Sequence, residues 1–278
     1  MTVAEFTPIV FAASLIAGFL GSLTGLGGGV IVTPVLTLFL GVDLRYAIGA
    51  SLVSVIATSS GAAAAYVRDG FSNIRIGMFL EIATTIGAIF GAFLGTQIST
   101  GALSILFGVI LMQAAWQASR EHRDSKKPVP PDPLGDKLQL NSELNTGHAI
   151  EGYKVRRVKS GFALMFGAGT ISGLLGIGSG SLKVIAMDQI MQIPFKVSTA
   201  TSNFMIGVTA AASASIYLSR GYVHPGVAMP VMLGVLAGSL IGARYLKKLS
   251  VPLLRRIFAV VVGLMAIEMI YSGVKGQL

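Results

Sequence analysis

Apolar residues run along this chain in long, nearly uninterrupted segments that are separated by short polar turns. A stretch of about 20 apolar residues is long enough to cross a bilayer as a helix. The pattern therefore predicts a series of membrane-spanning helices. The apolar segments are Phe6–Leu40, Tyr46–Val67, Ile74–Thr96, Thr100–Ala118, Gly161–Ile193, Val197–Leu218, Val223–Ala243 and Val251–Tyr271.

One long polar stretch, from Ser119 to Lys159, interrupts this pattern. It holds many of the acidic residues, several prolines and no hydrophobic periodicity, so a hydrated linker without a core is expected. The chain accordingly divides into a first transmembrane repeat (1–118), a hydrophilic linker (119–159) and a second transmembrane repeat (160–278).

The two apolar halves are the same unit repeated. A shift of 151 positions (176 − 25) places Gly25 on Gly176 and Gly27 on Gly178. Internal duplications of this kind are the usual construction of secondary transporters. The same shift, without a gap, also pairs Gly18 with Gly169, Gly29 with Gly180, Ser51 with Ser202, Thr58 with Thr209 and Tyr66 with Tyr217.

The first segment of each repeat is too long for one crossing. Phe6–Leu40 covers 35 residues (40 − 6 + 1), and a glycine cluster interrupts both it and its counterpart. Each is expected to form two half-helices, as a re-entrant hairpin or two short crossings, so that the chain returns to the side it came from. The expected fold is an all-α integral membrane protein of two inverted repeats, each with a broken or re-entrant first segment plus three transmembrane helices.

Composition and charge support this fold and suggest its orientation. Hydrophobic residues make up 53% of the chain and charged residues 12%, whereas soluble domains carry about 25% charged residues. Nine of the 21 Lys and Arg residues lie between Arg120 and Lys159, and five more lie between Arg244 and Arg256. Basic loops stay in the cytoplasm, which predicts a cytoplasmic linker and external N- and C-termini. The lipid bilayer is the expected partner; nucleic acid is not, and a homodimer is left open.

The chemistry is expected at the two glycine breaks. Non-helical backbone is tolerated inside a membrane only beside protein or a water-filled cavity, and the helix after each break would present unpaired N–H groups that favour an anion. The alternative is glycine for close helix packing, which we favour for Gly87/Gly91 and Gly238/Gly242. The predicted anion-binding residues at the breaks are Gly25, Gly27, Gly28, Gly29, Gly178, Ser179, Gly180 and Ser181.

The helices after the breaks carry a polar face. Ser51 and Thr58 are seven residues apart and share one helix face, and Ser202 repeats this position in the second half. Thr201 and Asn203 extend the second copy. These side chains are predicted to bind the anion, although membrane Ser and Thr also bond to carbonyls of their own helix.

Lys183 is the most informative charge, because it follows the second break by one turn and aligns with Val32 in the first repeat. A lysine inside a membrane is costly and marks a function by default. We expect it to neutralise the bound anion; the alternative is that its side chain extends to the membrane interface. Glu81 and Asp188 carry less weight, because they lie near segment ends.

An enzyme is not expected. The three histidines lie in the linker or at a loop, and no carboxylate pair or cluster with metal-ligand spacing occurs. The glycine clusters lack the lysine-serine ending of a phosphate loop. Neither a metal nor a cofactor is predicted, and no proton relay chain can be recognised.

At the breaks the chain resembles the TauE/SafE sulfite exporter family, within the group of toluene-sulfonate uptake permeases. The resemblance rests on GSLTGLGGGVIVTPVL (21–36) and AIGASL (47–52) in the first half, and on GLLGIGSG (173–180) and ATSN (200–203) in the second. It implies export of sulfite, organosulfonates such as sulfoacetate, or other small anions across a bacterial inner membrane. Ser179 departs from the repeat, since the first half has Gly28 there.

The expected function is therefore a secondary transporter that exports small sulfur-containing anions through a midplane site between two half-helix N-termini. An inside-negative potential drives an anion outward with about 2.3 kcal/mol per charge per 100 mV, so export needs no coupling ion. Two alternatives stay open: an ion-coupled importer of a small anion that uses the same site, and a membrane scaffold that does not transport.

Overall fold

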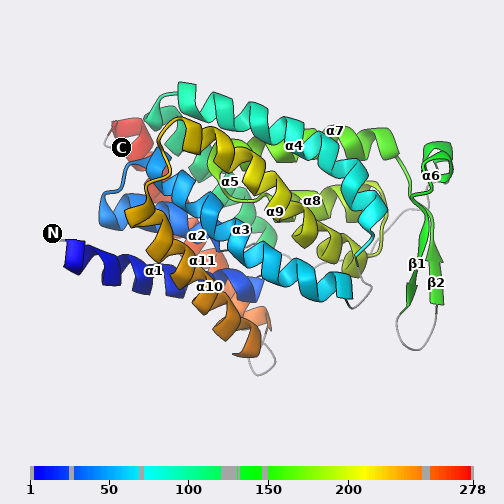
Figure 1. Cartoon of the computed structure of the whole chain (residues 1–278), viewed down its shortest axis with the longest axis horizontal. Coiled ribbons are helices and arrows are strands. Elements are labelled where there is room, and N and C mark those ends of the chain that lie inside the picture. Colours follow the sequence, from blue (N-terminus) through cyan, green and yellow to red (C-terminus); the bar gives the residue numbers. More distant parts are fainter. Residues whose placement is uncertain are drawn as a thin grey trace.

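The computed structural model describes residues 3–24, 28–68, 72–119, 130, 132–145, 150–245 and 251–276. These residues are almost entirely helical, and the one sheet among them is a two-stranded hairpin in the linker (Figure 1). Within this part of the chain, five helices are long and apolar enough to cross a membrane, judged by length and composition. The prediction of an all-α membrane protein is confirmed.

The two repeats have matching elements. The first contains α1 (Val3–Thr24), α2 (Gly29–Pro34), the π-helix η1 (Val35–Phe39), α3 (Leu44–Arg68), α4 (Ile74–Gln97) and α5 (Thr100–Ser119). The second contains α7 (Val158–Leu175), α8 (Gly180–Ile185), the π-helix η2 (Ala186–Ile190), α9 (Phe195–Ser219), α10 (Pro225–Tyr245) and α11 (Val251–Lys275). From α2 to α5, every element begins 151 positions before its counterpart (180 − 29 at α2 and α8). The duplication read from the glycines therefore extends to the element boundaries.

Both long first segments turn back on themselves. The backbone N–H of Arg156, just before α7, donates to the carbonyl oxygen of Met191, just after η2, at 3.1 Å. The two ends of this segment therefore lie side by side, as a re-entrant hairpin requires. In the first repeat, a Cβ on Gly28 would lie 3.4 Å from the Cα of Gly18, so the start of α2 packs back against α1.

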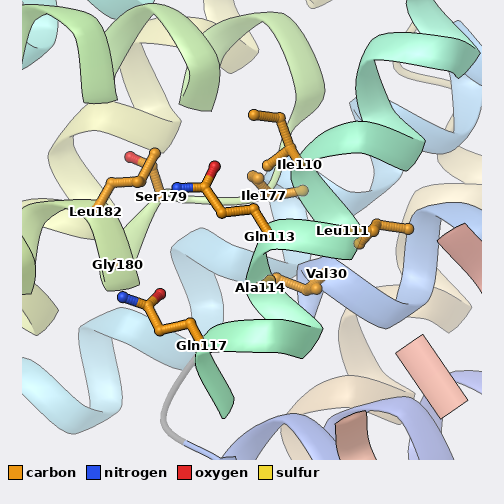
Figure 2. A pocket seen from close by; sticks show the side chains of 10 residues that line it. All are labelled: Val30, Ile110, Leu111, Gln113, Ala114, Gln117, Ile177, Ser179, Gly180 and Leu182. Atoms are coloured by element: carbon orange, nitrogen blue, oxygen red, sulfur yellow. The ribbon is translucent and has the colours of Figure 1, made fainter. Parts of the chain in front are cut away.

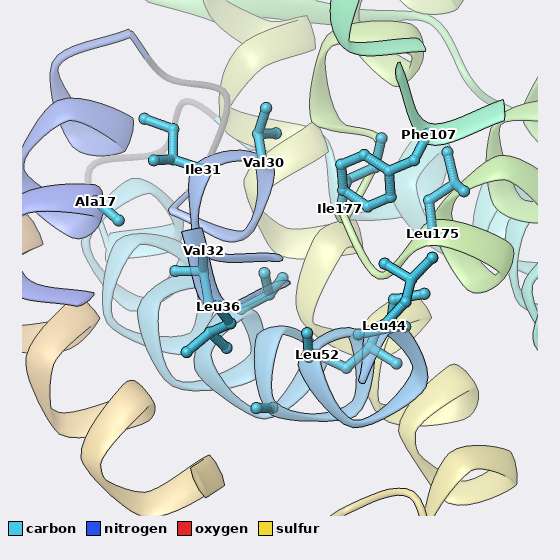
Figure 3. Close-up of a cluster of buried hydrophobic side chains, with 14 of the residues drawn as sticks. Ala17, Val30, Ile31, Val32, Leu36, Leu44, Leu52, Phe107, Leu175 and Ile177 are labelled. Carbon is cyan, nitrogen blue, oxygen red and sulfur yellow. The ribbon is translucent and has the colours of Figure 1, made fainter. Parts of the chain in front are cut away.

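Helices of one repeat pack against helices of the other. α1 packs against α10 and α7 packs against α4, while α5 pairs with α11 and α3 with α9. Each of these pairs joins one repeat to the other, so the core of the bundle is shared between them. α2 lies inside this core with all six of its residues buried. Figure 3 shows Val30, Ile31 and Val32 of α2 among side chains of α3 and α5 and beside Ile177 of the second break.

Glycines allow these paired helices to approach closely. A Cβ on Gly91 of α4 would collide with the carbonyl oxygen of Thr170 in α7, and Gly87 meets another carbonyl of α7 in the same way. Gly238 of α10 faces the carbonyl of Leu15 in α1. Because backbone atoms cannot move aside unless the helices separate, these glycines set the helix spacing. The packing role predicted for them is supported.

The linker is less hydrated than expected. It forms α6 (Pro133–Lys137), β1 (Ser142–Asn145) and β2 (Ile150–Tyr153), and it buries Leu140 and Val155 in a cluster with Ile76 of α4. The side-chain amide of Asn73, which caps α4, donates to the Tyr153 hydroxyl at 2.8 Å. Burial raises the pKa of the Tyr153 phenol, so this contact is neutral at physiological pH. The sequence missed this docking because the two buried residues are isolated and show no periodicity.

The bundle has two distinct ends. The first turn of α1 and the last turn of α11 lie at one end, and the linker hairpin lies at the other (Figure 1). α7 starts beside the linker, where the backbone N–H of Val158 donates to the carboxylate of Asp132 at 2.8 Å. Which end faces the cytoplasm, and with it the inverted membrane topology, stays a prediction.

Candidate functional site

The second break requires left-handed backbone at three positions. Gly176 and Gly178 have φ values of +69° and +70°, and Ser179 has a φ of +43°. Glycine adopts this region without steric cost, whereas a serine there is uncommon and strained. In the first break Gly28 is right-handed, with a φ of −64°. Gly25 and Gly27 lie outside the described residues.

Two serines at equivalent positions hold the breaks in place. The Oγ of Ser51 lies 3.2 Å from the carbonyl oxygen of Gly29 and 2.9 Å from that of Gly176, so it reaches both breaks. The Oγ of Ser202 donates to the carbonyl oxygen of Gly180 at 3.2 Å. Each hydroxyl has only one proton to donate, and a backbone carbonyl oxygen accepts it. Both serines therefore position the backbone of the breaks. The Ser51 contact brings the breaks of the two repeats within reach of one side chain.

A pocket opens beside the two breaks (Figure 2). It lies between the start of α2, the start of α8 and one face of α5. Val30, Ser179 and Gly180 line it from the breaks. Gln113 and Gln117 line it from α5, and Figure 2 shows their amide groups directed toward the second break.

The pocket contains an unused hydrogen-bonding group. Ser179 is 2% exposed, and its buried hydroxyl has no hydrogen-bond partner among the described residues. A buried hydroxyl without a partner costs free energy that a ligand oxygen can recover. The sequence predicted Ser179 and Gly180 here but missed Gln113 and Gln117. Their spacing of four residues, which places both on one face of an apolar helix, was the available signal.

Thr58, Thr201 and Asn203 do not line the pocket. Thr58 and Asn203 each bond to a carbonyl of their own helix, at 3.0 Å. Thr201 accepts a hydrogen bond from the backbone N–H of Asn73 at 3.0 Å, at the linker end of the bundle. Ser181 belongs to α8, but its side chain is outside what the structure describes. Binding of an anion by these residues stays a prediction, and the pocket lends it no support.

Lys183 is fully buried, at 0% exposure. Its Nζ donates to the hydroxyl of Thr209 in α9 at 2.5 Å. That hydroxyl lies 2.7 Å from Oε1 of Glu81 in α4 and 2.9 Å from the carbonyl oxygen of Met205 in its own helix, and it has one proton for these two acceptors. The Thr85 hydroxyl lies 3.1 Å from the same Glu81 oxygen. The side chain therefore does not extend to an interface, and the ammonium lies in a polar cluster that joins three helices.

Glu81 lies inside the protein, although the sequence analysis gave it little weight. It is the eighth residue of α4 (81 − 74 + 1) and is 8% exposed. Its Oε2 is buried and has no hydrogen-bond partner within the described part of the chain. The sequence could not reveal this, because Lys183, Thr209 and Glu81 meet only when α4, α8 and α9 pack together.

Comparison with known proteins identifies the family. The sequence profile of the sulfite exporter family TauE/SafE matches residues 10–269, nearly the whole chain. The chain belongs to the TauE/SafE family. The resemblance seen in the glycine motifs is thereby confirmed.

Two curated relatives are similar over nearly their full length. A probable membrane transporter protein of Bacillus subtilis, YunE, is 28% identical and covers 96% of this chain and 98% of its own. A probable membrane transporter protein of Methanocaldococcus jannaschii, MJ0441, is 26% identical, with 95% of each chain covered. No solved structure gives a significant match. The TauE/SafE membership and the apolar helices make this a multi-pass membrane protein of a transporter family.

Proposed function

We propose that this TauE/SafE protein exports small sulfur-containing anions, such as sulfite and sulfoacetate-like organosulfonates, across the bacterial inner membrane. The anion binds in the pocket between the two breaks and α5. The observation that carries this proposal is the Ser51 hydroxyl, which lies within 3.2 Å of carbonyl oxygens in both breaks and so joins them beside a pocket.

The pocket offers neutral donors to the anion. The unpartnered hydroxyl of Ser179 and the amides of Gln113 and Gln117 can each donate to an oxyanion without the cost of burying a charge. The helical run of α8 and η2 begins at the same place, and its first N–H groups favour negative charge. Several weak donors that surround one oxyanion suit a ligand that must also leave.

The test uses purified protein in proteoliposomes loaded with sulfite, sulfoacetate, thiosulfate, sulfate or acetate. Under an imposed membrane potential, we expect saturable efflux of sulfite or sulfoacetate that exceeds the acetate efflux. Opposite gradients separate export from import. Absence of saturable flux for all five anions in either direction would refute the proposal and favour the scaffold alternative.

Ser179→Gly tests the site. It places the residue of the first repeat in the second, tolerates the φ of +43°, and removes the hydroxyl. We expect KM to rise about tenfold, as the loss of a hydrogen bond to a charged ligand predicts. Ser60→Ala is the control, since this exposed hydroxyl bonds to its own helix at 2.7 Å. An unchanged KM in Ser179→Gly would remove the hydroxyl from the site.

A further inference from the structure

The polar cluster of Lys183, Thr209 and Glu81 has no role in the pocket described above. None of its side chains lines the pocket, yet it is more deeply buried than most polar groups of the protein, with exposures of 0% for Lys183 and Thr209 and 8% for Glu81. A buried ion pair adds little stability compared with apolar residues of the same size. The cluster therefore calls for a functional explanation.

The cluster lies close to the candidate site along α8. The backbone N–H of Lys183 donates to the carbonyl oxygen of Ser179 at 3.1 Å, so the two residues lie one helical turn apart. Leu182, the neighbour of Lys183, lines the pocket itself. Charges inside a protein are weakly screened, so an anion in the pocket interacts with both the ammonium and the carboxylate.

Charge balance then sets the consequence of anion binding. Without an anion, the lysine ammonium and the glutamate carboxylate cancel. An arriving anion adds negative charge that the pair does not compensate, which is strongly unfavourable in a buried site. A proton taken from water onto the carboxylate lowers this excess by one charge, because Glu81 becomes neutral while the Lys183 ammonium compensates one charge of the anion.

We propose that Glu81 is the proton-carrying group of this transporter, and that one proton enters Glu81 with each anion and leaves it on the opposite side. This inference rests on the anion transport proposed above. Oε2 of Glu81, buried and without a hydrogen-bond partner among the described residues, is the atom that receives the proton. Oε1 faces the hydroxyls of Thr209 and Thr85, at 2.7 and 3.1 Å.

Other ionisable groups near α4 are placed less favourably. Arg75 of α4, Lys159 of α7, Lys196 of α9 and Arg220 at the end of α9 are exposed, whereas Asp188 of η2 and Tyr217 of α9 are buried. Tyr217 donates to the carbonyl oxygen of Leu174 and faces the other end of α4, beside Gly95. Among the described residues, Lys183 is the cation that a hydrogen-bonded side chain connects to Glu81.

The experiment measures proton and anion movement together. Proteoliposomes carry a pH-sensitive dye inside, the membrane potential is clamped to zero with potassium and valinomycin, and sulfoacetate is the probe because it does not titrate near neutral pH. We expect about one proton per anion in the wild-type protein. In Glu81→Gln, which imitates the protonated state, we expect at least tenfold fewer protons per anion while anion flux continues down its gradient.

Binding provides a second measurement. The affinity of purified wild-type protein for sulfoacetate should fall as the pH rises, because deprotonation of Glu81 opposes the anion; the affinity of Glu81→Gln should be independent of pH. Glu268→Gln is the matched control, since this exposed carboxylate of α11 should leave coupling unchanged. Anion flux without proton movement in wild type, or full coupling in Glu81→Gln, overturns the inference alone. Absence of any anion flux overturns the proposed function instead.

Discussion

At the scale of single residues, one buried lysine carries a charge whose compensation is important for stability. The Lys183 ammonium is fully enclosed, and its charge is compensated through Thr209 by a carboxylate on another helix. Removal of one member of a buried pair leaves the other charge without compensation, which costs far more than the pair itself contributes. Single and double variants therefore distinguish a charge-balanced cluster from a lysine that is buried without a compensating charge.

Lys183→Met should lower the free energy of unfolding by about 3–5 kcal/mol, because Glu81 must then either stay charged without compensation or take up a proton. The double variant Lys183→Met/Glu81→Gln should recover most of this loss, since neither charge remains. Thermal unfolding of the detergent-purified variants measures both effects. A double variant that is less stable than Lys183→Met would show that the two charges do not compensate each other.

The sequence predicts single residues where backbone geometry decides, and it fails where partners come from distant helices. Gly178 was predicted from its place in an over-long apolar segment, and its φ of +70° agrees with that reason. Ser51 was predicted to bind the anion, which stays a prediction; its contacts with carbonyl oxygens of both breaks were not foreseen. The partners of Lys183 could not be predicted, because helical periodicity says nothing about which faces of α4, α8 and α9 meet.

At the scale of helices, spacing depends on glycines that face a neighbouring backbone. The pairs α4–α7 and α1–α10 are equivalent under the repeat, and both place glycine against carbonyl oxygens. Close approach of this kind replaces the hydrophobic driving force that is lacking between helices in lipid. The sequence predicted the packing role of Gly87, Gly91 and Gly238 from their four-residue spacing, although not which helices they face.

Gly91→Ala should destabilise the protein by about 1–3 kcal/mol, because its Cβ would collide with the Thr170 carbonyl and force α4 from α7. Gly167→Ala is the control within α7: nothing lies within 4 Å of a Cβ there. A helical alanine costs less conformational entropy than glycine, so Gly167→Ala should be neutral or slightly stabilising. Thermal unfolding compares the two; equal stability would show that the crossing is not sterically tight.

At the scale of the whole molecule, the polar linker and the transmembrane bundle, which the sequence presents as separate parts, pack together at one end of the bundle. The basic linker is read from composition as a hydrated segment, yet Leu140 and Val155 fasten it to the end of the bundle where α4 and α7 begin. The chain ends lie at the opposite end (Figure 1). The element order and the breaks could be predicted from apolar length and repeat alignment, whereas the docking could not, because two isolated apolar residues give no pattern.

This two-ended arrangement makes the membrane orientation testable. The chain has no cysteine, so single variants report without interference. Ser99→Cys lies in the exposed α4–α5 turn, and Glu143→Cys lies in β1 of the linker. A membrane-impermeant maleimide added to intact cells should label Ser99→Cys, and should label Glu143→Cys only after permeabilisation, because basic segments stay in the cytoplasm. The reverse labelling result would invert the membrane orientation but keep the fold. Labelling of both variants from one side would contradict the placement of the turn and the linker on opposite sides. The predicted inversion of the two repeats depends on that placement.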